Sequence, residues 1–251
     1  MSQYENKKKA FFSIITVVLN SEKFLEDTIN SVISQNEEIE YIIIDGGSTD
    51  NTLNIIRKYE KDIHYWISEK DGGIYDAMNK GMKQATGEYM CFVNSADILK
   101  KNALSIIKRY IDNDPGIDFV FGSVEKHWGI VHGYRPQKIK YSWGFYSSHS
   151  TGFFLKCDSA KKIGMYNLKY KYHADYDYFY RMIVQKKMRG ISTKKNEITG
   201  VFARGGFSSR SPYKKMFLEE LKIRFDNGQN IFLLLVIAVY KIIKHFRKII
   251  K

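Results

Sequence analysis

A short apolar segment that ends on an acidic residue and two glycines places the strongest constraint on this fold. Residues 41–50 read YIIIDGGSTD. An apolar run of this kind is typical of a strand that is buried on both faces of a parallel sheet. Ligands of open α/β sheets bind at the carboxyl ends of the strands, where the loops are free to vary. The sequence therefore predicts that Asp45 lies where a small polar ligand binds.

A second acidic, glycine-rich segment lies further along the chain. Residues 68–81 read SEKDGGIYDAMNKG and lead into a predicted helix. Two such loops close together indicate a nucleotide pocket, because both follow predicted strands and reach the same edge of the sheet.

Strands and helices alternate through the first half of the chain. The predicted strands are short apolar runs, at residues 12–18, 41–44, 63–67 and 89–93. The predicted helices have apolar residues at helical spacing, at residues 22–35, from Thr49 or Asp50 to about 59, and 75–86. The pattern changes after Pro115, with further strands at 118–124 and 152–156 and a helix at 173–187. The fold class predicted is α/β, with a doubly wound, mainly parallel central sheet and flanking helices.

Composition narrows the class of protein. A chain of 251 residues with 44% hydrophobic content can bury one large α/β domain. The two cysteines, Cys91 and Cys157, have no Cys or His nearby at metal-ligand spacing, which favours a reduced, cytoplasmic protein. Residues 1–10 are polar, and the apolar segment from Phe11 is too short for a secretory signal.

The basic charge predicts an acidic partner. The formal net charge of +13 suits nucleic acid, anionic lipid or a phosphorylated substrate. Near the C-terminus, an apolar run from Ile231 to Tyr240 is shorter than the roughly 20 residues that span a bilayer. A basic amphipathic tail follows it, with Ile242, Ile243, Phe246, Ile249 and Ile250 on one helical face and Lys241, Lys244, Arg247, Lys248 and Lys251 on the other. We expect a helix lying on an anionic membrane surface. The alternative is a helix packed on the domain or on a second subunit.

Acidic residues stand at several strand ends and helix starts. Asp97 follows the strand at 89–93, and a cation bound to a diphosphate usually needs only one or two protein carboxylates. Asp97 is therefore a candidate Mg²⁺ or Mn²⁺ ligand, or else the N-cap of a helix that begins near Leu99. Asp175 opens a helix, where its carboxylate also interacts favourably with the helix dipole.

Five segments in the same order resemble glycosyltransferase family 2. They are TVVLN (16–20), IIIDGGSTDNT (42–52), EKDGGIYDAMNKGMKQATGEY (69–89), FVNSAD (92–97) and HADYDYFYRM (173–182). The resemblance covers roughly residues 11–208 and is strongest to bacterial enzymes that extend O-antigen, capsule and related surface glycans. It implies a GT-A fold, a nucleotide-sugar donor, a divalent metal and inversion at the anomeric carbon. The organisation expected is a polar tail at 1–10, a GT-A domain at 11–228 and an amphipathic helix at 229–251.

The resemblance also implies roles for single residues. Asp45 corresponds to the acid that contacts the uracil or ribose, and Asp97 to the last acid of the metal-binding DxD-type motif. Asp175 aligns with the catalytic base. Other residues fall in the nucleotide-binding strands and loops, namely Thr16, Val18, Asn20, Asp71, Lys80, Asn94 and Ser95.

The chain departs from the family pattern at three positions. Ser95 stands at the first acidic position of the DxD-type motif, Ala96 precedes Asp97, and Ala174 replaces the usual Glu. Metal binding therefore rests on one carboxylate, while the base is retained.

The chemistry of the base follows from the residues themselves. An acceptor hydroxyl is a poor nucleophile and must lose its proton as the new bond forms, and a carboxylate within hydrogen-bond reach can accept that proton. We expect Asp175 to do so in preference to Asp177, which points to a different helical face.

Two later segments are candidates for contacts with the acceptor or the diphosphate. His149, in SSHSTGFF, would contact either group, or else form a structural hydrogen bond. In FARGGFSSR, Gly206 and Ser208 would form a loop over the diphosphate, or else only a turn, and Arg210 adds a cation there.

The sequence thus predicts an inverting, metal-dependent glycosyltransferase on the cytoplasmic face of a bacterial inner membrane. It would transfer a hexose or N-acetylhexosamine from a UDP-sugar to a polyprenyl-diphosphate-linked glycan. A sugar nucleotidyltransferase is one alternative, but it would normally have a glycine-rich basic loop where residues 18–24 read VLNSEKF. A non-enzymatic nucleic-acid or membrane binder would explain the charge but not the acids after successive strands, so nucleic acid is not the expected partner. A homodimer remains open.

Overall fold

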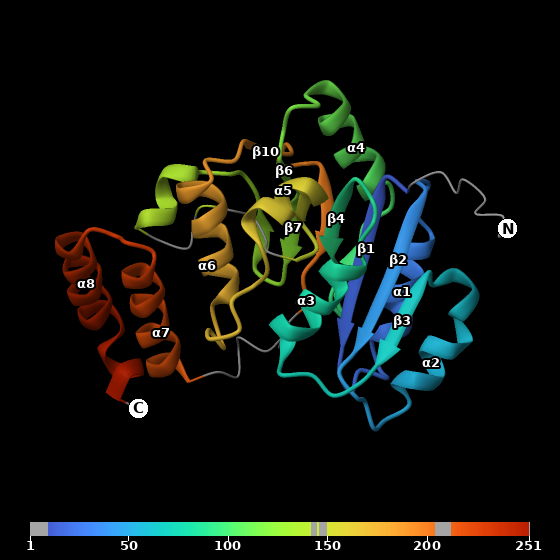
Figure 1. Cartoon of the computed structure of the whole chain (residues 1–251), viewed down its shortest axis with the longest axis horizontal. Helices are drawn as coiled ribbons and strands as arrows, with labels where there is room; N and C mark the ends of the chain where they lie inside the picture. Colours follow the sequence, from blue (N-terminus) through green and yellow to red (C-terminus); the bar gives the residue numbers. More distant parts are fainter. Residues whose placement is uncertain (1–9, 142–144, 146–149, 204–211, 251) are drawn as a thin grey trace, which may run out of the picture.

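A seven-stranded sheet forms the centre of the molecule (Figure 1). The computed structural model describes residues 10–141, 145, 150–203 and 212–250. The strand order is β10-β6-β9-β4-β1-β2-β3. These strands are β1 (Phe12–Val18), β2 (Ile39–Asp45), β3 (Tyr65–Ser68), β4 (Tyr89–Phe92), β6 (Phe119–Phe121), β9 (Phe153–Lys156) and β10 (Gly190–Ser192). Only β9 runs antiparallel to its described neighbours, β4 and β6, which confirms the predicted mainly parallel α/β sheet.

Helices cover both faces of this sheet, because successive apolar residues of a strand point to opposite faces. In β1, Ile14 belongs to one buried cluster and Ile15 to the other. One face is covered by α1 (Leu25–Ile33), α2 (Thr52–Lys58) and α4 (Ala103–Asn113), and the other by α3 (Ile74–Gln84), α5 (Cys157–Ile163) and α6 (Ala174–Tyr180). Gly81 lets α3 approach the sheet closely, since a Cβ there would lie 2.4 Å from Cγ2 of Ile15.

A smaller sheet lies beside the main one. It has the order β5-β11-β7-β8 and consists of β5 (Ile98–Leu99), β7 (Ser123–Lys126), β8 (Gly129–Val131) and β11 (Ile198–Val201). The prediction of one strand over 118–124 is wrong, because the chain passes from the large sheet to the small one at Gly122. A Cβ at Gly122 would lie 2.1 Å from Oγ1 of Thr199, so the absence of a side chain at Gly122 makes room for the Thr199 side chain at this crossing.

Two other sequence-based expectations need correction. Leu99 lies in strand β5 and helix α4 begins at Ala103, so Asp97 is not a helix N-cap. The helix expected over 173–187 is α-helical only over Ala174–Tyr180. A π-helical turn over Arg181–Gln185 follows it directly. Short 3₁₀ turns occupy Glu60–Asp62 and Pro136–Lys140. By contrast, β1 matches the predicted strand at both ends.

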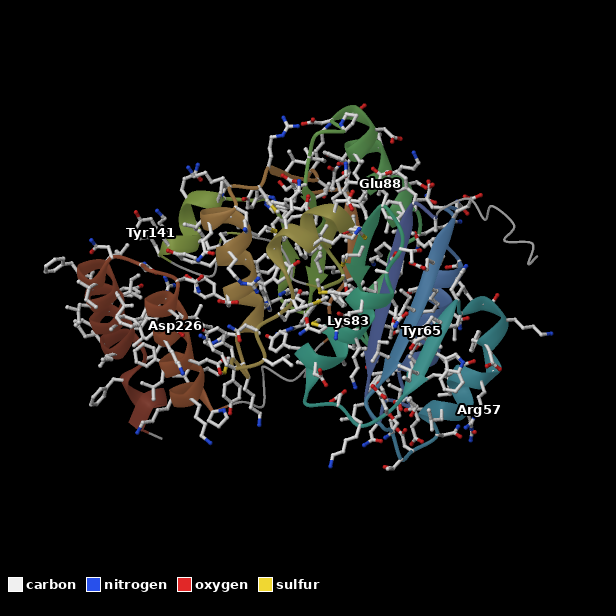
Figure 2. The ribbon with its side chains drawn as sticks, in the orientation of Figure 1. Arg57, Tyr65, Lys83, Glu88, Tyr141 and Asp226 are labelled. Atoms are coloured by element: carbon white, nitrogen blue, oxygen red, sulfur yellow. The ribbon has the colours of Figure 1, made fainter. Side chains whose placement is uncertain are left out.

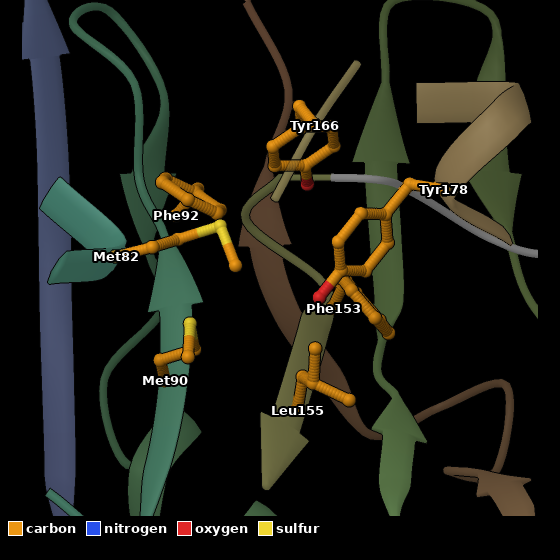
Figure 3. A pocket seen from close by; sticks show the side chains of 7 residues that line it. All are labelled: Met82, Met90, Phe92, Phe153, Leu155, Tyr166 and Tyr178. Carbon is orange, nitrogen blue, oxygen red and sulfur yellow. The ribbon is translucent and has the colours of Figure 1, made fainter. Parts of the chain in front are cut away.

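Aromatic and sulfur-containing side chains fill the space between α3, α6 and the middle of the sheet (Figure 3). The rings of Tyr166 and Tyr178 stack with centroids 4.5 Å apart. A small internal gap remains there, lined by Met82, Met90, Phe92, Phe153, Leu155, Tyr166 and Tyr178. It cannot hold a water molecule, so it belongs to the packed core.

The last two helices form a hairpin at one end of the molecule (Figure 1). Helix α7 spans Tyr213–Asp226 and α8 spans Ile231–Ile250, with a non-helical break at His245 (φ −121°, ψ 21°). Lys241 of α8 forms an ion pair with Glu220 of α7, which also pairs with Arg224 at 2.7 Å. None of the described helices combines the length and the apolar character needed to cross a bilayer.

Candidate active site

The loops after β1, β2 and β4 meet at the carboxyl edge of the central sheet. These strands are adjacent and parallel, so their ends fall side by side. Hydrogen bonds join the loops to neighbouring strands: the amide of Gly46 donates to the carbonyl of Val18 at 2.9 Å, and that of Ser95 to Val17 at 3.3 Å. The predicted donor site is therefore assembled by the parallel register of the sheet.

Asp45 is fully buried at the end of β2. Its carboxylate accepts hydrogen bonds from the amides of Gly47 (3.1 Å) and Ser48 (2.9 Å). The hydroxyls of Ser48 and Ser68 also donate to it, the latter at 2.6 Å. Asp45 thus shapes the turn that follows β2 and ties it to the end of β3. Its contact with a nucleotide stays a prediction.

Asn20 joins the loops after β1 and β2. Its backbone amide donates to Oγ of Ser48 at 2.7 Å, and its side-chain Oδ1 accepts from the backbone amide of Thr49 at 2.8 Å. Asn20 adopts a positive φ of 47°, which asparagine tolerates better than most residues. The other two residues predicted in this region, Thr16 and Val18, are buried. The Thr16 hydroxyl donates to the carbonyl of Val93 at 2.8 Å, so both residues form the floor beneath the loops.

The DGG loop before α3 lies against the turn after β2. A Cβ on Gly46 would lie 2.4 Å from Oδ2 of Asp71, so the two loops meet where Gly46 has no side chain. The other carboxylate oxygen of Asp71 accepts from the amide of Gly73 at 2.8 Å. Lys80 lies further along, in α3. It pairs with Glu69 at 2.7 Å, and this hydrogen bond raises the pKa of Lys80. Asp71 and Lys80 therefore both belong to the segment formed by the DGG loop and α3.

Asp97 is held inside the protein by several donors. It is 4% exposed, and its carboxylate accepts from the hydroxyls of Ser150 (3.1 Å) and Thr151 (2.9 Å) and from the amide of Ala203 (2.9 Å). The hydroxyl of Thr28 bonds to the backbone of the same turn, at the Asp97 carbonyl (2.9 Å) and the Ala96 amide (3.0 Å). Asp97 thus links the turn after β4 to Ser150 and Ala203, which lie 53 and 106 residues away in the sequence.

The same turn provides a second oxygen. Oδ1 of Asn94 is buried and has no hydrogen-bond partner among the described residues. A buried amide oxygen in this state costs free energy unless a ligand or a cation satisfies it. Among the described residues, no cluster of three or more His, Cys, Asp or Glu side chains could hold a metal. Asn94 and Asp97 fit a cation that takes its other oxygens from a diphosphate and water.

Asp175 lies in the first turn of α6 and is 6% exposed. Its Oδ1 accepts from the hydroxyl of Tyr75 at 3.1 Å and from the amide of Tyr176 at 2.9 Å. Asp177 has different partners: it pairs with Arg181 at 2.9 Å and accepts from Asn227 at 2.9 Å. These contacts tie Asp177 to the body of the protein, whereas Asp175 is directed to helix α3.

Tyr75 connects Asp175 to the DGG loop, and sequence reasoning missed it. It lies at the start of α3, two residues after Gly73 of the DGG loop, and its hydroxyl also lies 3.2 Å from the carbonyl of Tyr172. Burial, together with the nearby Asp175 carboxylate, raises the pKa of Tyr75, which keeps its hydroxyl protonated as a donor. Helical periodicity marks Tyr75 only as a core residue, because the partner lies 100 residues away in the chain.

Lys126 is a second residue that the sequence did not indicate. Its ammonium lies 4.4 Å from the ring centroid of Phe202, which precedes the Ala203 that bonds Asp97. Burial lowers the pKa of Lys126, and the charge of Asp97 opposes this shift. A cation therefore lies in the neighbourhood of Asp97.

For several predicted site residues, the structure gives no side-chain contact that tests the predicted role. His149, Gly206, Ser208 and Arg210 lie outside the described residues. Ser95 is half-buried in the turn after β4, and its backbone amide donates to the carbonyl of Val17. Their roles stay predictions.

Comparisons with known proteins agree with this geometry. The model of the family "Glycosyl transferase family 2" matches residues 13–198. A PGL/p-HBAD biosynthesis glycosyltransferase of Mycobacterium tuberculosis is 28% identical over 249 residues, which cover 90% of this chain and 89% of that protein. The poly(ribitol-phosphate) β-N-acetylglucosaminyltransferase TarS of Staphylococcus aureus is 36% identical over 107 residues, covering 40% of this chain and 19% of TarS.

Solved structures show the same fold. Residues 1–349 of S. aureus TarS in complex with UDP-GlcNAc superpose with a TM-score of 0.69 at 18% identity, covering 94% of this chain and 72% of that one. The mannosyltransferase PcManGT from Pyrobaculum calidifontis, in complex with GDP-Man and Mn²⁺, gives a TM-score of 0.61 at 15% identity, covering 88% and 64%. With the family match over most of the chain, the protein belongs to glycosyltransferase family 2 and is a glycosyltransferase with a GT-A-type fold.

Proposed function

We propose that this protein is an inverting glycosyltransferase that takes a hexose or N-acetylhexosamine from a UDP-sugar. The observation that carries the proposal is the hydrogen bond between Tyr75 and Asp175. It places a buried carboxylate beside the helix that begins at the DGG loop, and that loop contacts the turn after Asp45. This contact supports one site in which Asp175 is the base beside the predicted donor loops.

The comparisons support a UDP-sugar as the donor. S. aureus TarS has been solved with UDP-GlcNAc and with UDP, and its fold covers 94% of this chain. Asp45, Asn20 and Asp71 lie in the loops where a uridine diphosphate would bind at the sheet edge.

In the proposed reaction, Asp175 accepts the proton of the acceptor hydroxyl. The hydroxyl oxygen forms a bond to the anomeric carbon while the bond from that carbon to the diphosphate oxygen breaks. The electron pair of the broken bond remains on the departing UDP. Attack from the face opposite the diphosphate inverts the anomeric centre. Backbone amides of the loops after β1, β2 and β4 and the charge of Lys126 stabilise the negative charge that develops on the leaving group.

A bound Mg²⁺ or Mn²⁺ would add positive charge at the diphosphate. Asn94 and Asp97 would hold it. Of these two, Asn94 has the buried oxygen that no described group satisfies, and Asp97 is already held by the hydroxyls of Ser150 and Thr151.

The proposed acceptor is a polyprenyl-diphosphate-linked glycan of a bacterial surface polysaccharide, of the O-antigen or capsule type, at the cytoplasmic face of the inner membrane. Relatives named for PGL/p-HBAD biosynthesis and for transfer to poly(ribitol-phosphate) support a role in bacterial glycan assembly.

The direct test is incubation of the protein with a panel of UDP-sugars, Mn²⁺ and a polyprenyl-diphosphate-linked sugar, followed by measurement of released UDP and of product. We expect UDP release and a glycosylated product with one donor. Absence of both with every donor, together with failure to bind UDP, would overturn the proposal. Release of pyrophosphate from a nucleoside triphosphate and a sugar phosphate would indicate a nucleotidyltransferase.

A further inference from the structure

Helix α8 turns an apolar face outward, and Lys241 on its opposite side points to α7. Six large apolar side chains recur at helical spacing along one face of α8, and each of them is more than half exposed. They are Phe232, Leu235, Val236, Val239, Ile243 and Phe246. Phe232 is 75% and Ile243 is 74% exposed. The opposite side of the helix holds Ile237, which is buried, and Lys241, which pairs with Glu220. This orientation is the reverse of that expected for a surface helix surrounded only by water.

The buried charges explain why α8 keeps this orientation. Glu220 and Arg224 of α7 are 4% and 0% exposed in their side chains, and they form an ion pair at 2.7 Å. Lys241 completes this cluster from α8. Rotating α8 to bury its apolar face would withdraw Lys241 and leave a buried carboxylate with less compensation, which is costly. The outward apolar face is thus fixed by the ion cluster beneath it.

The charges of the hairpin formed by α7 and α8 indicate the partner of this face. From residue 212 to the C-terminus the chain has nine basic residues and three acidic ones. Each of the three acids is engaged: Glu219 with backbone amides, Glu220 with Arg224, and Asp226 with Lys169. On α7, Lys214 and Lys222 alternate with the exposed Leu218 and Phe225 along one face. In Figure 2 the side chains that project from the outer edge of α8 are largely carbon.

We infer that the hairpin of α7 and α8 docks in the plane of an anionic lipid surface, with the outward face of α8 inserted among the headgroups. The apolar run Ile231–Tyr240 is about 15 Å long at 1.5 Å per residue, half of the roughly 30 Å hydrocarbon core, so the helix lies along the surface. A second copy of the chain is a poorer occupant, because each copy carries a net charge of +13 and exposed lysines on the same hairpin. Anionic headgroups attract those lysines and accept the apolar side chains.

The docked hairpin is joined to the site. Glu219 of α7 accepts hydrogen bonds from the amides of Lys171, Tyr172 and His173, each at 2.7 Å. This segment leads directly into the helix that carries Asp175. A surface that holds α7 and α8 therefore holds the base-bearing helix close to lipid-borne acceptors.

The test is co-sedimentation of the full chain with vesicles of phosphatidylcholine, alone or with about one third phosphatidylglycerol. We expect binding to the anionic vesicles, weakened by salt and by neutral lipid. The variant with Phe232→Gln, Val236→Gln and Ile243→Gln should lose at least about tenfold in partitioning, because these side chains face outward and make the apolar contact. Glutamine keeps helix propensity, so the fold is retained, as circular dichroism would check.

A matched control replaces three exposed apolar residues away from the hairpin, with Phe24→Gln, Trp128→Gln and Ile130→Gln, and should bind as the unaltered chain does. A third variant, Lys214→Gln with Lys215→Gln and Lys222→Gln, should lose its preference for anionic over neutral vesicles several-fold. The inference is overturned if the unaltered chain does not bind anionic vesicles, or if the glutamine triple variant on α8 binds them equally well. The face would instead belong to a second copy if the unaltered chain binds no vesicles, forms a dimer in ultracentrifugation, and loses that dimer in the glutamine triple variant on α8.

The proposed function is tested separately by UDP binding without vesicles. A chain that binds UDP but no vesicle would overturn only the docking surface. A chain that binds vesicles but no UDP would overturn only the donor assignment.

Discussion

Asp175 and Tyr75 show how much of this site depends on single contacts between distant residues. The carboxylate of Asp175 accepts from Tyr75 and from the backbone at the start of its own helix. These hydrogen bonds fix the orientation of the carboxylate. Its neighbour Asp177 instead binds Arg181 and Asn227. We therefore expect the two acids of this helix to have separate roles, which substitutions can distinguish.

Asp175→Asn should abolish transfer and leave UDP binding nearly unchanged. The amide cannot accept the acceptor's proton, and loss of a general base typically costs about 10²- to 10⁴-fold in rate. Steady-state kinetics and calorimetry with UDP measure the two effects. Asp177→Asn is the control: it breaks the pair with Arg181 and should lower the free energy of unfolding more than it alters the chemical step. Equal loss of UDP binding in both variants would contradict this division.

Tyr75→Phe should lower kcat without abolishing transfer and should leave UDP binding nearly unchanged. It deletes the hydroxyl that lies 3.1 Å from Oδ1 of Asp175 and leaves the ring packed in the core. Without that donor the carboxylate loses one of the hydrogen bonds that orient it, so it is placed less well for the acceptor hydroxyl. Tyr166→Phe, on the neighbouring ring, is a control that should leave kcat unchanged. An unchanged kcat for Tyr75→Phe would show that the contact does not position Asp175.

At the scale of elements, the hairpin of α7 and α8 is held to the domain by buried charges. Arg224 is fully buried, donates to Glu220 and to the carbonyl of Lys140, and lies 4.9 Å from the ring centroid of Tyr176 in α6. Burial opposes ionisation of Glu220, but Lys241 and Arg224 outweigh it and lower the pKa of Glu220. Because the charges depend on each other, loss of one leaves the others uncompensated.

Glu220→Gln should destabilise the protein strongly. It leaves the buried guanidinium of Arg224 without its carboxylate, and breaking a buried pair in this way typically costs about 3–5 kcal/mol. Urea denaturation measures the free energy of unfolding. The control is Glu26→Gln, which removes an exposed pair with Lys58 and should change that free energy little. A small effect of Glu220→Gln would mean that the cluster does not hold the hairpin.

The same cluster predicts an acid transition. The pKa of Glu220 is lower in the folded protein than its ordinary value of 4.5, so the folded state is favoured wherever Glu220 is ionised. This stabilisation is complete above the ordinary value and is lost as the pH falls below it through the lowered pKa. Urea denaturation from about pH 7 to about pH 3 should show a steeper loss for the unaltered protein than for Glu220→Gln. Parallel curves would exclude the contribution of Glu220.

At the scale of the whole molecule, the predicted donor site is distributed over segments that come together only in the folded chain. Loops after β1, β2 and β4, the start of α3 and the start of α6 each contribute, and the contacts of Asp97 reach Ser150 and Ala203. A donor that binds this set binds the folded state and not the unfolded chain. Ligand binding should therefore stabilise the entire domain.

UDP should raise the free energy of unfolding by about 2.7 kcal/mol at a hundred times its Kd. Thermal denaturation with and without UDP and Mn²⁺ measures this shift. Chelation of the metal should reduce the shift if Asn94 and Asp97 hold a cation at the diphosphate. Asn94→Ala should then make the UDP shift independent of Mn²⁺, and a full response to Mn²⁺ in this variant would exclude Asn94 as a ligand.

Local sequence determined the alternation of strands and helices, the parallel sheet and the acids at its edge. Apolar runs such as 12–18 and the acid and glycines after Ile44 act over a few residues, and their backbone preferences need no distant partner. The family resemblance added the positions of Asp97 and Asp175, and the family match confirmed the class of enzyme.

Only the tertiary structure decided the contacts between distant segments. The pairing of Tyr75 with Asp175, the enclosure of Asp97 by Ser150 and Thr151, and the change of sheet at Gly122 each join residues far apart in the chain. The direction of the faces of α8 was likewise set by Glu220 on another helix, which helical periodicity does not include. Periodicity identifies which residues share a face, but the direction in which that face points depends on the partner that the fold places beside it.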